Sequence, residues 1–222
     1  MVQAASVFLI VLGISAAAIS ADEYTSEACD CVRTGKVVLA LSHPVARLDR
    51  FESKTGNQAA LNWVPTADER KWVYLVIHHS ATNSGSVDAI HSEHRKRKDS
   101  LGNPWLGIGY HFVIGNGSGM EDGEVEATFR WKNQIHGAHS GSAVHNANGI
   151  GICLIGNFQD KQPTSKQLKA VTNLVAQLSK RYQIPARLVI GHNTVKPTAC
   201  PGRHFPLQDV IRDSVTDGKL NS

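Results

Sequence analysis

The sequence contains three side chains of the kinds that bind zinc, at positions that a folded sheet would bring close together. His78 closes an apolar run at 73–77, His192 closes a second run that begins at 188, and Cys200 follows eight residues after His192. Two buried strands that each end in a histidine would deliver both imidazoles to one edge of a sheet. Catalytic zinc typically has three protein ligands and one open position. The set therefore predicts a hydrolytic zinc site.

The neighbours of these residues sharpen the assignment. Pro197 and Pro201 bracket the segment that carries Cys200, so this loop is restricted and would fix its thiolate at a lower entropic cost. His79 adjoins His78, but successive side chains of a strand point to opposite faces. We therefore predict His78, and not His79, as the first ligand.

Strands and helices alternate through the part of the chain that would carry this site. Most of the candidate strands are nearly continuous apolar runs, which indicates a sheet covered on both faces. Thr164 and Gln167 form a capping-box pattern ahead of a helix with apolar residues three and four apart. The fold class expected is α/β, with a central mixed β-sheet flanked by helices in a single catalytic domain. The expected strands are 72–78, 109–114, 124–128, 149–156 and 188–192, and the expected helices are 87–98, the segment after 164, and 207–215.

The beginning of the chain has the pattern of an export signal. Residues 4–19 are apolar, small residues follow, and charged residues start at Asp22. This length suits a secretory signal better than a membrane span of about 20 residues. We expect a signal peptide at 1–21, an N-terminal extension at 22–60, a catalytic domain at 61–216 and a tail at 217–222. The protein would then be secreted or periplasmic, in the cell envelope, with no stable membrane span after processing.

The formal net charge is +4, and residues 1–21 contribute no charged side chain to it. A mild basic excess suits an acidic polymer such as a bacterial wall and is too small to indicate nucleic acid. Cys153 lies in an apolar run, where a buried inert thiol is the ordinary finding. For Cys29 and Cys31 a local disulfide, pairing with another chain and free thiols all stay open.

Five segments in one order resemble the zinc-dependent N-acetylmuramoyl-L-alanine amidases, a superfamily that includes peptidoglycan recognition proteins and an amidase-type phage lysozyme. The resemblance covers roughly residues 63–212. One such segment would be weak evidence, whereas five in order with the ligand types in place are specific. The segments are 76–82, 109–114, 137–139, 149–156 and 191–202.

The resemblance implies a function and a set of roles. By position, His78, His192 and Cys200 match the family's ligands for one Zn²⁺ per chain, and Tyr110 matches a tyrosine near the metal that assists catalysis. Thr198 falls where catalytic recognition proteins have threonine, which implies a catalytic residue that could offer a second hydrogen bond. His111 and His139 match positions that line the peptidoglycan groove. The implied activity is hydrolysis of the amide bond between N-acetylmuramic acid and L-alanine, with peptidoglycan or muropeptides as the partner.

Two alternatives remain beside this enzyme: a module that binds peptidoglycan without cleaving it, and an unrelated zinc hydrolase. Non-catalytic relatives typically lack the cysteine ligand, so Cys200 favours the enzyme. Animal recognition proteins often carry a cysteine pair after the first histidine segment, and this chain has none there. The stretch 117–124 also looks longer than the usual turn. Both departures favour a bacterial exported enzyme over a close relation to the immune proteins.

Overall fold

The computed structural model describes residues 63–99 and 101–220, with side chains described as far as Thr216. The signal peptide and the N-terminal extension expected at 1–21 and 22–60 lie outside the described residues, as do Cys29 and Cys31.

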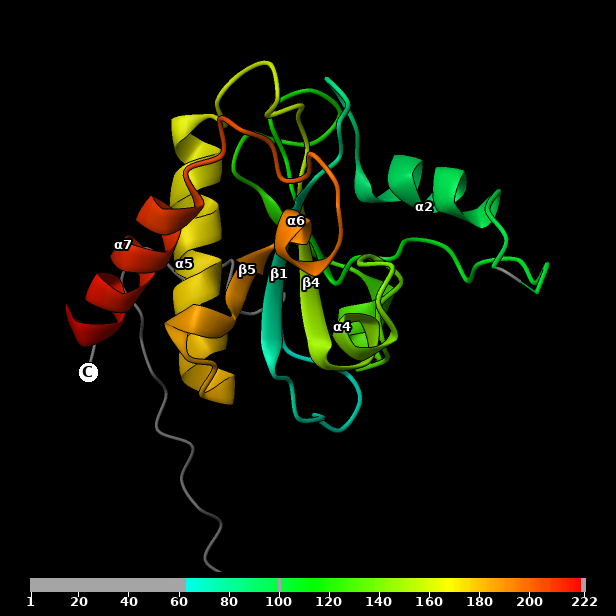
Figure 1. Cartoon of the computed structure of the whole chain (residues 1–222), viewed down its shortest axis with the longest axis horizontal. Coiled ribbons are helices and arrows are strands. Elements are labelled where there is room, and N and C mark those ends of the chain that lie inside the picture. Colours follow the sequence, from blue (N-terminus) through cyan, green and yellow to red (C-terminus); the bar gives the residue numbers. More distant parts are fainter. Residues whose placement is uncertain (1–62, 100, 221–222) are drawn as a thin grey trace, which may run out of the picture. The chain divides into compact units, whose positions relative to one another are not determined.

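A five-stranded mixed sheet forms the centre of the described part (Figure 1). Its order is β3-β2-β4-β1-β5, and β2, β4, β1 and β5 run parallel while β3 pairs antiparallel with β2. This arrangement confirms the predicted fold class. The strands are β1 (Tyr74–His79), β2 (Phe112–Ile114), β3 (Val125–Ala127), β4 (Gly149–Leu154) and β5 (Val189–Gly191).

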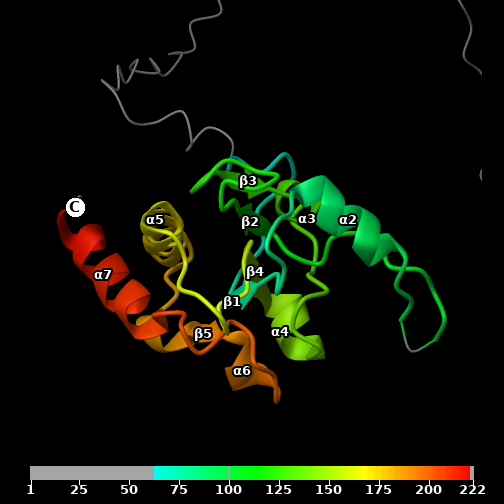
Figure 2. The same ribbon diagram turned by 90° about the horizontal axis from the view of Figure 1, so that it is seen from above.

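Helices cover both faces of this sheet. Figure 2 shows α5 and α7 on one side of it and α2 and α4 on the other. The helices are α2 (Val87–Arg95), α3 (Phe129–Lys132), α4 (Ala143–Asn148), α5 (Ser165–Tyr182), the 3₁₀ turn η1 (Ala186–Leu188), α6 (His192–Val195) and α7 (Leu207–Leu220).

The face that meets α5 holds the main hydrophobic core. Leu75 and Ile77 of β1 are fully buried there with Val171 and Leu174 of α5. The capping box that begins α5 is present, because the Thr164 hydroxyl accepts from the Gln167 N–H while the Gln167 side chain accepts from the Thr164 N–H. Apolar burial and a capped start together explain why this long helix lies against the sheet.

The opposite face is the one that carries chemistry. Alternation along β1 turns His78 away from Ile77, and the register places His78 beside Cys153 of β4. Gly149 and Gly151, on the same face of β4, have no side chains, so this part of the face has room for rings from elsewhere. A smaller cluster of Val87, Ile108, Val113, Met120 and Ile155 closes this side.

Several predicted boundaries are wrong. Residues 109–111 precede β2 and are not part of it, α2 ends at Arg95 instead of 98, and α7 runs into the expected tail as far as Leu220. The short helices α3, α4 and α6 were not predicted, since four to six residues are too few to show a helical period. Across residues 63–99 and 101–220, no helix has the length and apolar character that crossing a bilayer requires.

Candidate metal centre and substrate groove

His78, His192 and Cys200 meet at the carboxyl ends of two neighbouring strands. Ile77 of β1 is the register partner of Gly191 of β5. The next residues, His78 and His192, therefore lie at the same edge of the sheet. The His78 and His192 rings lie 4.5 Å apart between centroids. Cys200 Sγ lies 3.7 Å from His78 Nδ1, and one donor atom from each of the three residues lies within 4.8 Å of the others.

These distances fit a tetrahedral metal. Zinc bonds of about 2.1 Å to nitrogen and 2.3 Å to sulfur place those two donors about 3.6 Å apart at a tetrahedral angle. The separation of 3.7 Å between His78 Nδ1 and Cys200 Sγ is close to that value. Two imidazoles and a thiolate are a donor set that zinc favours. The residues present therefore fit one zinc ion.

Both histidines use their outer ring nitrogen in a hydrogen bond. His192 Nε2 donates to the Ser140 carbonyl at 3.1 Å, and His78 Nε2 lies 3.0 Å from His139 Nδ1. In each ring this leaves Nδ1 as the nitrogen free to bind a metal. Such partners are the usual companions of metal-binding histidines because they hold the ring orientation.

The loop that carries Cys200 is tied to β1 and to itself. The backbone N–H of His79 donates to Cys200 Sγ at 3.3 Å, which favours a thiolate. The hydroxyl of Thr198 accepts from the Cys200 N–H at 3.4 Å. Thr198 is partly buried, and its described hydrogen bond shapes the ligand loop.

Burial sets the protonation of this cluster without a metal. It holds the pKa of His78 well below its usual range, with further lowering from His139 and His192, and it also lowers the pKa of His192. Burial raises the pKa of Cys200 to about 11, against the opposing hydrogen bond from His79. At neutral pH the imidazoles are therefore ready to bind a metal, whereas the thiol must release its proton to solvent when a metal binds.

Tyr110 stands next to the cluster. Its ring lies 5.1 Å from the His78 ring between centroids, and it also lines a groove at the surface. Burial, followed by the nearby Cys153 and Cys200, raises the Tyr110 pKa well above its ordinary value. The phenol is therefore a hydrogen-bond donor at any ordinary pH and not a base.

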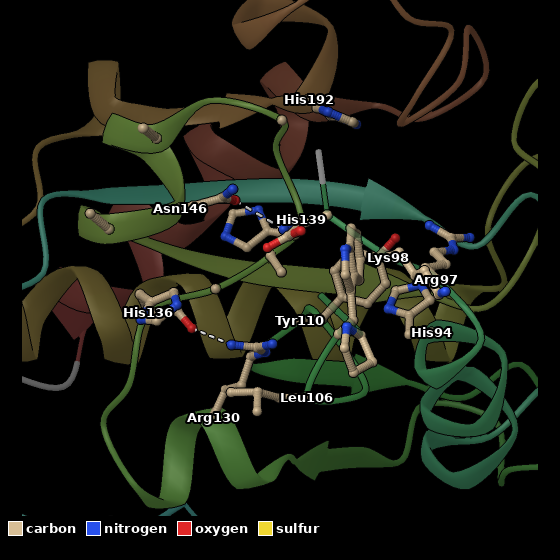
Figure 3. Close-up of a pocket in the computed structure, with 18 of the residues that line it drawn as sticks. His94, Arg97, Lys98, Leu106, Tyr110, Arg130, His136, His139, Asn146 and His192 are labelled. Carbon is tan, nitrogen blue, oxygen red and sulfur yellow. Dashed lines mark hydrogen bonds between the residues drawn. The ribbon is translucent and has the colours of Figure 1, made fainter. Parts of the chain in front are cut away.

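A groove of roughly 920 Å³ opens beside Tyr110 and His192 (Figure 3). Arg97 and Lys98, from the segment that follows α2, line one part, and Lys196 lines another. Leu106 and Trp105 add apolar surface. The groove thus combines cationic and apolar side chains with one carboxylate, that of Asp99, and it suits a ligand that carries both carboxylates and apolar groups.

The histidines predicted to line a groove differ in position. His139 borders the groove but is only 7% exposed, and it contacts His78. His111 is fully buried, its Nδ1 accepts from the Gly151 N–H, and its Nε2 donates to the Ile135 carbonyl. With both nitrogens occupied, His111 does not line the groove and supports β4 instead, which corrects the expectation for that residue.

The remaining predicted placements follow the alternation of β1. His79 points to the other face, where its Nδ1 accepts from the Phe158 N–H at 3.1 Å. It contributes its backbone N–H, and not its ring, to Cys200.

Two contributors were missed in the sequence. The Ser140 carbonyl orients His192, and no side-chain pattern reveals a backbone acceptor. Arg130 lines the groove but is almost fully buried, and it donates to the carbonyls of Ile108 and His136, the second contact being drawn in Figure 3. An arginine of the short helix α3 carries no periodic signal that would have indicated this role.

Comparisons with known proteins agree with this geometry. A family model described as N-acetylmuramoyl-L-alanine amidase matches residues 68–203. Peptidoglycan-recognition protein SC2 of Drosophila melanogaster is 36% identical over 138 residues, which are 60% of this chain and 69% of that protein. Peptidoglycan recognition protein 1 of Mus musculus is 34% identical over 135 residues, 58% of this chain and 69% of that protein.

A solved structure is similar as well. N-acetylmuramoyl-L-alanine amidase LysC from Clostridium intestinale URNW aligns with a TM-score of 0.53 and 27% identity, covering 72% of this chain and 94% of that one. The expectation that this chain is only distantly related to animal recognition proteins is not supported. Two such proteins are 36% and 34% identical to it, compared with 27% for the Clostridium amidase. The matched segment spans the sheet and all three candidate ligands, and the chain belongs to the N-acetylmuramoyl-L-alanine amidase family.

Proposed function

We propose that this protein is a zinc-dependent N-acetylmuramoyl-L-alanine amidase that cleaves peptidoglycan between N-acetylmuramic acid and L-alanine. The observation that carries the proposal is the convergence of His78, His192 and Cys200 beside Tyr110 at one groove. A binding module would need the groove alone. Three zinc-type donors with an adjacent phenol are the groups that metal-assisted hydrolysis uses.

The chemistry divides between the metal and the chain. Zinc, when bound by these three residues, supplies a Lewis acid that polarises an amide carbonyl and acidifies a water molecule. Tyr110 donates a hydrogen bond from its neutral phenol to the carbonyl oxygen as negative charge develops there. The Ser140 carbonyl holds the His192 imidazole in orientation. Thr198 keeps the Cys200 loop in place through its hydroxyl.

The substrate class follows from the groove. Stem peptides of peptidoglycan carry carboxylates, and Arg97, Lys98 and Lys196 provide positive charge along the groove. The lactyl-alanine amide would lie near Tyr110 and His192, with the peptide along the cationic part. We further propose that the protein acts in the cell envelope or outside the cell after export. Mass spectrometry of the mature N-terminus, expected after residue 21, tests that localisation.

Recognition without cleavage is the second candidate, and the names of the relatives favour it. Proteins named for peptidoglycan recognition are 33–36% identical to this chain, and that name describes binding only. Cys200 and Tyr110 together argue for the enzyme, because binding alone would require neither a thiolate donor nor a phenol beside the donor set.

One experiment separates these candidates. The zinc-loaded protein is incubated with a disaccharide tetrapeptide, and the products are identified by mass spectrometry. The amidase proposal expects a free disaccharide and a peptide with an L-alanine amino terminus. Saturable binding of the intact muropeptide with no product would instead establish the recognition module.

A further inference from the structure

His139 links the sheet backbone to the candidate metal centre. Its Nδ1 lies 3.0 Å from Nε2 of His78, and its Nε2 lies 3.3 Å from the carbonyl oxygen of Gly149 in β4. The ring is 7% exposed, and its own backbone N–H donates to the Asn146 side chain. Both ring nitrogens are therefore occupied by the protein and not left for a ligand in the groove.

The direction of these bonds follows from the Gly149 carbonyl. A carbonyl oxygen only accepts, so Nε2 of His139 carries the hydrogen of that bond. A neutral imidazole has a single ring hydrogen, which leaves Nδ1 of His139 as an acceptor. Nε2 of His78 must then donate to it, and Nδ1 of His78 has no hydrogen. That bare nitrogen is the one beside Cys200 Sγ.

Two glycines make room for the His139 ring. A Cβ placed on Gly151 would lie 2.5 Å from Cδ2 of His139, and a Cβ placed on Gly137 would lie 2.3 Å from the same atom. Both separations are too short for any side chain, so a larger residue at either position would displace the ring. The position of His139 is thus fixed by hydrogen bonds at its edge and by glycine backbone around it.

We propose that His139 is a positioning residue that holds His78 in the tautomer with Nδ1 free for the metal. The inference rests on the proposed metal centre. A partner on the outer nitrogen of a metal-binding imidazole fixes its tautomer and orientation, and losing it costs about 10–100-fold in metal affinity. The corresponding partner of His192 is the backbone carbonyl of Ser140, which a substitution does not remove. Of the two partners, only the His139 side chain can be removed by substitution.

Three variants isolate the acceptor. His139→Leu removes it, whereas His139→Asn places an amide oxygen where Nδ1 stands and keeps it. His136→Leu is the matched control, because His136 is an exposed groove histidine whose described hydrogen bond uses only its backbone carbonyl. Zinc dissociation constants are measured by competition with a chromophoric chelator. We expect an affinity about 10–100-fold weaker for His139→Leu, substantial recovery in His139→Asn and no change in His136→Leu.

The tautomer of His78 is a second readout, and it would not change if His139 only supported the fold. Long-range ¹H–¹⁵N correlation spectra of the metal-free protein report which nitrogen of His78 carries hydrogen. We expect Nε2–H alone in the wild type and a mixture in His139→Leu. Gly151→Ala should also weaken zinc binding although no histidine is replaced, because the new Cβ would displace the His139 ring from His78.

The outcomes are distinct. A wild-type His78 with its hydrogen on Nδ1 would overturn the proposal, and this measurement needs no variant to fold. Wild-type zinc affinity in a folded His139→Leu would also overturn it while leaving the metal centre intact. A wild-type protein that binds no zinc would remove the metal centre, and with it the proposed function.

Discussion

The backbone N–H of His79 donates to the sulfur of Cys200 at 3.3 Å, although 121 residues separate them. Strand β1 therefore supplies one donor, the His78 imidazole, and also holds the thiol of another. Because the third donor follows β5, which pairs with β1, the candidate centre depends on a single pair of parallel strands.

Removing the thiol should abolish zinc binding. Cys200→Ser leaves a poor zinc donor, so we expect zinc affinity to fall by more than about 100-fold, beyond the loss expected from an outer partner alone. Cys153→Ser is the control, since Cys153 is also a buried free cysteine but is not part of the donor cluster. Metal analysis after dialysis should find about one zinc per chain in the control and almost none in Cys200→Ser. Equal zinc in both proteins would contradict the assignment.

Zinc binding near pH 7 should release close to one proton. The Cys200 pKa of about 11 lies above that pH, so the thiol is protonated before binding and a thiolate afterwards. The pKa values of His78 and His192 are lowered by burial, so these rings have little to release. Calorimetry in buffers of different ionisation enthalpy measures the number. No release, or release of two protons, would show that the protonation of the cluster is different.

Tyr110→Phe should retain zinc and lose rate. Removal of one hydrogen bond to a developing oxyanion costs about 10²–10³ in rate. Since burial raises the Tyr110 pKa, the wild-type rate should show no decline from phenol ionisation up to about pH 10, the ordinary pKa of tyrosine. The kcat of both proteins on a muropeptide, with their zinc contents, tests this role. Full activity in the phenylalanine variant would exclude it.

The sequence predicts that His78, His192 and Cys200 lie close together, as they do in the structure, and it does so for a physical reason. His78 and His192 follow apolar runs, and strands that run parallel in one sheet place such ends together. The partners of these histidines were not predictable. Whether His139 faces a substrate or His78 depends on the glycines of β4, on the turn before α4 and on tertiary packing. His111 shows the same limit, because its burial depends on Trp72 and Gly151.

Acid should destabilise the metal-free protein through its buried histidines. Burial lowers the pKa of His94 to about 4, so the unfolded chain binds a proton in a range where the folded protein does not. The stability that the neutral His94 ring contributes is fully present above about pH 6.5, its pKa in the unfolded chain. It is lost as the pH falls towards 4, its pKa in the folded protein. Between pH 7.5 and 5.5 this residue alone should lower the free energy of unfolding by about 1.4 kcal/mol.

Urea denaturation in the presence of a chelator measures that slope. His94→Asn keeps an acceptor for the Gly109 N–H but has no titrating ring, so its stability should fall less over the same range. An identical slope in the variant would show that His94 is not buried in its neutral form.

The most direct test of the central claim is the titration of metal-free protein with zinc while cleavage of a disaccharide tetrapeptide is followed by mass spectrometry. The account predicts that release of the L-alanine-terminated peptide rises linearly with zinc and levels off at one equivalent per chain. It also predicts that chelator abolishes the release and that Cys200→Ser shows none. Cleavage at full rate without zinc, or no cleavage by a protein that holds one zinc, would contradict it.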